Sequence, residues 1–102
     1  MVTVVYKVLI KEGKEEQFKE IALKCEECAH SSKDCIYYTF YRSLNNPRDF
    51  IVSYRFTSKE AQDNHIEKLQ EVIGPAPNKR DLPSKFLELV ESEDVVLFDV
   101  KL

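Results

Sequence analysis

The stretch DFIVSYRF, residues 49–56, decides the fold, because every even position in it carries a large apolar or aromatic side chain. The stretch VTVVYKVLI, residues 2–10, alternates in the same way and is rich in β-branched residues. Side chains two positions apart lie on the same face of a strand, so both stretches predict strands with one face against a core. The predicted core face consists of Val4, Tyr6, Val8, Ile10, Phe50, Val52, Tyr54 and Phe56.

The rest of the chain supplies two more strands and three helices. Apolar residues at helical spacing predict a helix over about residues 14–29, and an aromatic-rich strand follows at 35–44. A turn at 45–48 joins that strand to residues 49–56 as a hairpin. Thr57 begins a capping-box pattern, with Ser58 as a competing cap, for a helix that reaches about residue 73. A short helix over about 83–90 and a strand at 95–101 complete the pattern.

This order of elements predicts an α+β fold. It is the ferredoxin-like βαββαβ arrangement, in which helices cover one face of an antiparallel four-stranded sheet. The chain has 102 residues, and we expect residues 1–102 to form a single domain.

The opposite face of the sheet is neither a closed core nor fully polar. Its odd-numbered positions mix Val5, Leu9 and Ile51 with Lys7, Ser53 and Arg55. Two helices cannot cover both faces, so we expect a homodimer that packs sheet against sheet, forming a dimeric α/β barrel. The alternative is a solvated face, which antiparallel sheets tolerate.

Composition narrows the class of protein. The net charge is −3 and the basic residues are scattered, so no nucleic-acid partner is expected. No apolar stretch approaches the roughly 20 residues of a membrane span, and no signal peptide is seen at the N-terminus. The odd count of three cysteines favours free thiols in a reducing compartment, so the expected location is cytoplasmic.

His65 is the main catalytic candidate. It shares the predicted inward stripe of its helix with Ala61 and Leu69, which places an imidazole among apolar neighbours. Burial there lowers the pKa of a histidine and keeps it neutral near pH 7, so His65 could act as a general base. The alternative is a structural histidine bonded to a backbone carbonyl or to a tyrosine.

The even face beneath this helix carries Tyr6, Tyr54 and Phe56, which with His65 could line an aromatic substrate pocket, with Asn64 at its rim. The alternative is that these aromatic residues fill the core.

A metal site is not expected. Cys25, Cys28, His30 and Cys35 could be read as zinc ligands, but their spacing matches no standard structural site, and buried free thiols are the preferred interpretation. Lys79 and Arg80 are interpreted as solvated loop charges.

The chain resembles the antibiotic biosynthesis monooxygenase family, which includes small bacterial quinol monooxygenases. The likeness covers almost the whole chain. It starts in VTVV at 2–5 and KEGKEE at 11–16, continues in CIYYTFYR at 35–42, and is strongest in FIVSYRF at 50–56. Glu60, Ala61 and His65 follow in the order and spacing of the family.

The resemblance implies an oxidoreductase that needs no cofactor. A small phenolic or quinol-type aromatic would be deprotonated by His65, which matches the family histidine, and its anion would react with O2. The haem-degrading branch uses an Asn and a Trp where this chain has Tyr6 and Phe56, so haem degradation is not expected. Two other functions remain open: a non-enzymatic dimeric domain for ligand binding or stress response, and an isomerase of a small carbonyl compound.

Overall fold

A computed structural model describes residues 1–99 of the chain. Its elements, in chain order, are β1 (Val2–Ile10), α1 (Glu15–His30), β2 (Cys35–Arg42), β3 (Asp49–Phe56), α2 (Lys59–Val72), α3 (Ser84–Leu87) and β4 (Val90–Asp99). All four strands belong to one sheet in the order β2-β3-β1-β4, and the three pairings are antiparallel. The predicted ferredoxin-like α+β fold is confirmed.

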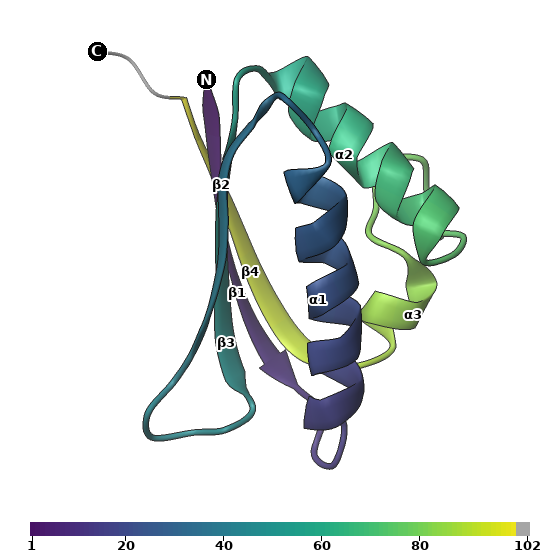
Figure 1. Cartoon of the computed structure of the whole chain (residues 1–102). Helices are drawn as coiled ribbons and strands as arrows, with labels where there is room; N and C mark the ends of the chain where they lie inside the picture. The colour runs from purple at the N-terminus through teal and green to yellow at the C-terminus, as the bar shows by residue number, and fades with distance from the viewer. Residues whose placement is uncertain (100–102) are drawn as a thin grey trace.

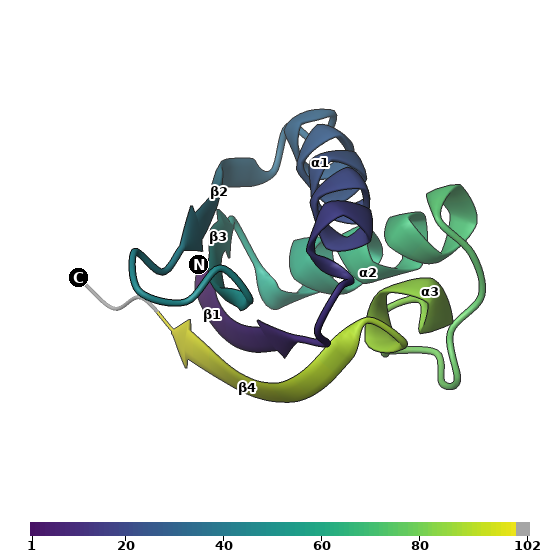
Figure 2. The same ribbon diagram turned by 90° about the horizontal axis from the view of Figure 1, so that it is seen from below.

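All three helices lie on one side of the sheet (Figure 1). Seen from below, α1 and α2 lie over the sheet and α3 lies beside the start of β4 (Figure 2). The pairing register places Val4 opposite Tyr54 and Val8 opposite Phe50, so the even positions of β1 and β3 share the helix-facing side. These positions are buried, as the alternation predicted.

Phe18 of α1 lies at the centre of an aromatic cluster in the core. Its side chain is fully buried, and its ring lies 4.7 Å from Phe50, 5.6 Å from Phe86 and 6.3 Å from Phe40. Phe86 belongs to α3, so this cluster ties the short helix to both α1 and the sheet. The core therefore fixes the position of α3.

The start of α2 differs from the first-choice prediction. Ser58, not Thr57, is the N-cap, and its hydroxyl accepts a hydrogen bond from the backbone N–H of Ala61 at 3.1 Å. Thr57 instead contacts Asp34 through its backbone N–H and its hydroxyl, at 2.9 and 3.2 Å. The competing cap was correct because Thr57 is used to tie the α1–β2 connection to the end of β3.

The C-terminal elements also differ from prediction. The short helix spans only Ser84–Leu87, with Pro83 as its N-cap, and β4 begins at Val90 rather than at residue 95. The polar run at residues 91–94 weakened the strand pattern, but the backbone at 92–94 pairs with β1, and the register shifts between Leu9 and Ile10. The predicted strand residues 100 and 101 lie outside the described part of the chain.

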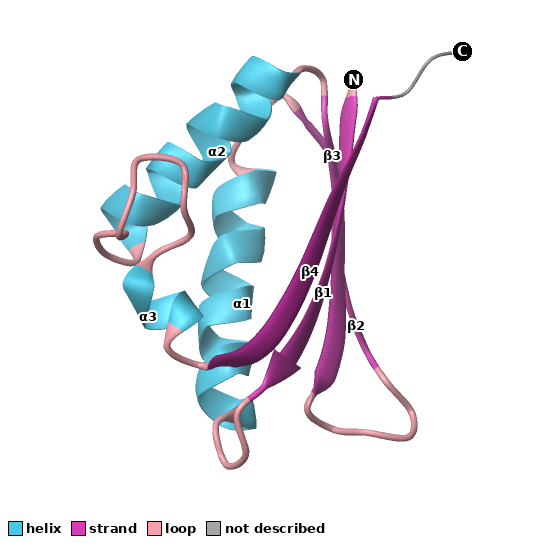
Figure 3. Cartoon of the chain, turned by 180° about the vertical axis from the view of Figure 1, so that it is seen from behind, coloured by secondary structure: helices cyan, strands magenta, loops and turns pink. Residues whose placement is uncertain are grey.

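Among residues 1–99, no helix covers the other face of the sheet (Figure 3). Val5, Leu9 and Ile51 on this face are half-buried, while Val96 and Phe98 of β4 are 42% and 52% exposed. Arg55 donates to the Thr3 hydroxyl at 2.8 Å, and its guanidinium lies over the ring of Tyr37. The face is thus an apolar surface crossed by a few polar side chains. In the part of the chain described, no helix is long and apolar enough to cross a membrane.

Candidate functional site

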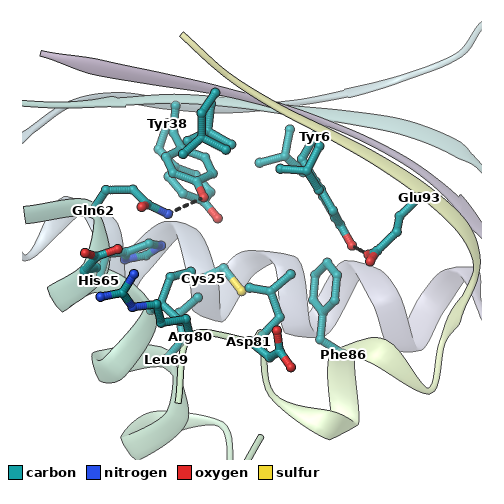
Figure 4. A pocket seen from close by; sticks show the side chains of 18 of the residues that line it. Tyr6, Cys25, Tyr38, Gln62, His65, Leu69, Arg80, Asp81, Phe86 and Glu93 are labelled. Atoms are coloured by element: carbon teal, nitrogen blue, oxygen red, sulfur yellow. Dashed lines mark hydrogen bonds between the residues drawn. The ribbon is translucent and has the colours of Figure 1, made fainter. Parts of the chain in front are cut away.

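A cavity of about 290 Å³ lies between the sheet and the helices. Its walls come from all four strands, from α1 and α2, and from the segment that leads into α3. Figure 4 shows Gln62 and His65 on one side of the cavity and Tyr6 with Glu93 on the other. Apolar side chains lie between these two polar ends, among them Val4, Val52 and Leu69, as expected for a small-molecule site.

His65 points from α2 into this cavity. The residue is 5% exposed, and its Nε2 is buried without a hydrogen-bond partner among residues 1–99. Aromatic rings surround the imidazole, with centroids 5.1 Å away for Phe56, 5.5 Å for Tyr38 and 5.7 Å for Tyr54. An unpaired buried ring nitrogen costs free energy that a bound hydrogen-bonding group would recover.

Burial lowers the pKa of His65 to about 4, because the apolar surroundings disfavour the imidazolium. The ring is therefore neutral at any pH well above 4, and a neutral imidazole can accept a proton. An anion formed beside it would favour the imidazolium again, because opposite charges in a low-dielectric site attract strongly.

A chain of polar contacts runs beside His65. Lys59 donates to Oε1 of Gln62 at 2.9 Å, which directs the Gln62 amide nitrogen toward the hydroxyl of Tyr54 at 3.4 Å. Tyr54 stacks on Tyr38, with ring centroids 4.9 Å apart. Burial raises the pKa of Tyr54 to about 12, so its phenol stays protonated. Tyr54 can therefore donate a hydrogen bond into the cavity but does not supply a base.

The opposite end of the cavity holds a tyrosine and a carboxylate. The Tyr6 hydroxyl donates to Oε2 of Glu93, and the Tyr6 ring lies 5.8 Å from Phe86. Burial, together with the neighbouring Glu93 carboxylate, raises the pKa of Tyr6, so this phenol is also protonated. One end thus presents a neutral imidazole, and the other presents the carboxylate of Glu93.

The segment between α2 and α3 forms part of the cavity wall. The Gln70 side-chain amide lies 2.8 Å from the carbonyl oxygen of Asp81, 2.9 Å from that of Lys79 and 3.3 Å from that of Asn78. These contacts hold the segment so that Arg80 and Asp81 line the cavity. Arg80, interpreted from sequence as a solvated charge, is exposed but also forms part of the cavity wall.

The structure brings together three of the five candidate site residues. His65, Tyr6 and Tyr54 line the cavity, whereas Phe56 is fully buried behind the imidazole. Asn64 is exposed on the outer side of α2 and does not line this cavity; it borders a separate surface hollow with Glu67 and Arg80. Because His65 lies on the inward face of α2, the adjacent Asn64 lies on the outward face.

Sequence reasoning missed Tyr38, Gln62 and Glu93. Tyr38 pairs with Tyr54 across the hairpin, so assigning faces to β2 as well as to β1 and β3 would have found it. Gln62 lies one turn before His65 on the same face of α2 and is 7% exposed. Glu93 was placed outside the last strand, because that strand was expected to begin two residues later.

The three cysteines are at positions 25, 28 and 35. All three are free, and no group of three or more His, Cys, Asp or Glu side chains within residues 1–99 is arranged to hold a metal ion. Cys25 lines the cavity, but burial raises the pKa of its thiol to about 12, so it is not a ready nucleophile.

Comparisons with known proteins agree on fold and family. The sequence model of a family described as antibiotic biosynthesis monooxygenase matches residues 1–68. A conserved protein from Methanosarcina mazei Go1 superimposes with a TM-score of 0.79 at 19% identity, covering 98% of this chain and 92% of that one. SnoaB from Streptomyces nogalater, a cofactor-independent oxygenase, superimposes with a TM-score of 0.74 at 13% identity, covering 99% and 93%. No curated protein matches the sequence.

Proposed function

The chain belongs to the antibiotic biosynthesis monooxygenase family, and from this premise we propose that it is a monooxygenase that needs no cofactor. Its substrate would be a small phenolic or quinol-type aromatic, and its co-substrate O2. The proposal depends on His65, which lines a mostly apolar cavity and whose buried Nε2 has no hydrogen-bond partner among residues 1–99. A phenolic hydroxyl placed there would supply the missing hydrogen bond and present its proton to a neutral base.

The reaction balances without an external electron donor. His65 accepts the hydroxyl proton of a para-hydroquinone, and the electron-rich anion gives electrons to O2. One oxygen atom forms a bond to ring carbon, the other leaves as water, and the product is the hydroxylated quinone. The imidazolium returns its proton to the departing oxygen, and the four electrons that O2 takes up all come from the substrate.

The cavity contributes orientation and exclusion of water. Tyr38 and Tyr54 form a stacked aromatic wall next to His65, against which a flat aromatic ring can lie. The protonated Tyr54 phenol, bonded to Gln62, can donate to an oxygen anion as it develops. Holding the anion and O2 together in an apolar enclosure lowers the entropic part of the barrier.

The purified protein is expected to consume O2 when given naphthohydroquinone, at a rate well above the uncatalysed rate. An oxygen electrode measures this directly, with a chelator present and no flavin or metal added. Chelation should leave the rate unchanged. A rate equal to that of buffer with an inert protein would contradict the proposal.

A second candidate is a non-enzymatic domain that holds a hydrophobic ligand in the same cavity. The observation in its favour is that, within residues 1–99, no polar group orients the His65 ring through a hydrogen bond at Nε2. Ligand-dependent increases in melting temperature without O2 consumption would favour this candidate. The free cysteines fit a reducing compartment such as the cytoplasm in either case.

We also propose that two chains pack together through the uncovered face of the sheet. The exposed Val96 and Phe98 pair with Val5 and Thr3 of β1, which extends the apolar surface of that face to the sheet edge. Burying such a surface between identical faces gives a closed two-fold dimer. A chain of this size gains considerably from the extra burial.

Light scattering at micromolar concentration is expected to give twice the chain mass of 11.9 kDa. Val5→Arg, which places a charge in the middle of the apolar face, should shift the protein toward a monomer. Lys11→Ala, at an exposed position outside the sheet, serves as the control and should remain dimeric. A wild-type mass of one chain would contradict this arrangement.

A further inference from the structure

The end of the cavity away from His65 carries a feature that base catalysis does not use. Tyr6 is 4% exposed, and its hydroxyl donates to the carboxylate of Glu93 on the neighbouring strand (Figure 4). Both residues line the cavity. Glu93 comes from the edge strand β4, so its carboxylate is close both to the cavity and to solvent.

The position of Glu93 on the strand is unusual for a carboxylate. It pairs with Val8, and Val95 pairs with Tyr6, so Glu93 points to the helix-facing side of the sheet. On that side it lies beside Val8, its pairing partner, and Tyr6, its hydrogen-bond partner. Glu93 is itself exposed, so its carboxylate meets solvent on one side and the cavity lining on the other.

The carboxylate also has unused hydrogen-bonding capacity. An ionised carboxylate offers about four lone-pair positions, and Tyr6 donates to one oxygen only. The remaining positions accept hydrogen bonds and donate none, so they select for a ligand that carries an O–H or N–H group. Tyr6 holds the carboxylate in place and keeps its own proton.

We propose that Glu93, positioned by Tyr6, binds a second hydroxyl group of the substrate at the end of the cavity opposite His65. The site would then select aromatic diols whose hydroxyls lie at opposite ends of the ring system over aromatics with a single hydroxyl. The aromatic class itself rests on the proposed function. The cavity has a volume of about 290 Å³, which suits a small ring system that spans it with one hydroxyl at each end.

Binding without turnover separates this proposal from the oxygenase proposal. Under argon, isothermal titration compares 2-naphthol with a dihydroxynaphthalene that carries one hydroxyl on each ring. The wild-type protein is expected to bind the diol about tenfold more tightly, because a hydrogen bond to a charged acceptor contributes that much or more. Diol selectivity in a protein that consumes no O2 would support this inference while the oxygenase proposal fails.

Two variants assign the selectivity to this pair. Glu93→Gln should reduce the preference for the diol to less than about threefold, because a neutral amide is a weaker acceptor. Tyr6→Phe, which keeps the ring and its contact with Phe86, should reduce it partially. Glu91 lies two residues earlier, pairs with Arg48 and does not line the cavity. The control variant Glu91→Gln should therefore keep the full preference for the diol. Affinity for the naphthol should stay constant in Glu91→Gln, and in Glu93→Gln it should fall less than the affinity for the diol does.

Several results would overturn the inference. They are equal binding of the two probes by the wild-type protein, no binding of either probe, and retention of the full preference in Glu93→Gln. A loss of affinity for both probes to the same extent in Glu93→Gln would show a structural role instead. Melting curves of each variant confirm that the fold is retained.

Discussion

Replacing His65 with glutamine is expected to lower kcat for naphthohydroquinone about a hundredfold. Glutamine keeps a polar side chain of similar reach but cannot take up a proton, and general base catalysis contributes roughly 10²–10⁴ in rate. Anaerobic binding of the same substrate should change only a few-fold, because the aromatic walls formed by Tyr38 and Tyr54 remain. Steady-state O2 consumption and anaerobic titration measure the two quantities separately.

Asn64→Ala provides the matched control, since Asn64 adjoins His65 in sequence but faces solvent outside the cavity. Its kcat should stay within about twofold of the wild-type value, as is usual for surface substitutions. The wild-type kcat/KM should also show no loss from His65 protonation between about pH 5 and 7, because the free imidazole has a pKa of about 4. Unchanged turnover in the glutamine variant would exclude His65 as the base.

The same histidine should make folding stability depend on pH. The unfolded chain binds a proton at His65 with a pKa of 6.5, whereas the folded protein does so only near 4. Below pH 6.5 the unfolded state therefore holds more protons, and stability falls as the pH decreases toward 4. The full loss corresponds to about 3 kcal/mol, since one pKa unit equals about 1.4 kcal/mol.

Urea unfolding at about pH 7 and pH 4.5 measures this loss, and the comparison is made between variants because carboxyl groups also titrate in acid. His65→Gln should lose less stability than the wild-type protein over this interval, by about 2–3 kcal/mol. His30→Gln changes the other histidine, which is exposed at the end of α1, and should behave as wild type. Equal losses in wild type and in His65→Gln would show that the imidazole is not excluded from water in the folded protein.

Much of the fold could be predicted from two short stretches. The alternation in residues 2–10 and 49–56 identified the helix-facing side of the sheet, because burial on one face requires a period of two. The ends of elements were harder to predict. The start of β4 was missed because edge strands tolerate charged residues, so Glu91 and Glu93 interrupted a pattern that burial normally creates.

The site was only partly predictable, for a different reason. His65 was found because an inward-facing polar residue breaks an otherwise apolar helical stripe. Tyr6 and Tyr54 followed from the parity of their strands. Gln62 shares the inward face of α2 with His65 but was not considered, and Glu93 was missed because β4 begins earlier than its charged residues suggested. Asn64 was included for its closeness in sequence to His65, which on a helix places it on another face.

If His65 generates a substrate anion in this cavity, the anion reacts with O2 and one oxygen atom enters the product. Turnover of naphthohydroquinone under oxygen-18 gas, with mass analysis of the product, tests it most directly. We expect one labelled oxygen atom in each molecule of hydroxylated quinone formed by the wild-type protein, and almost no labelled product with His65→Gln. An unlabelled quinone formed together with hydrogen peroxide, or labelled product formed equally well by both proteins, would contradict it.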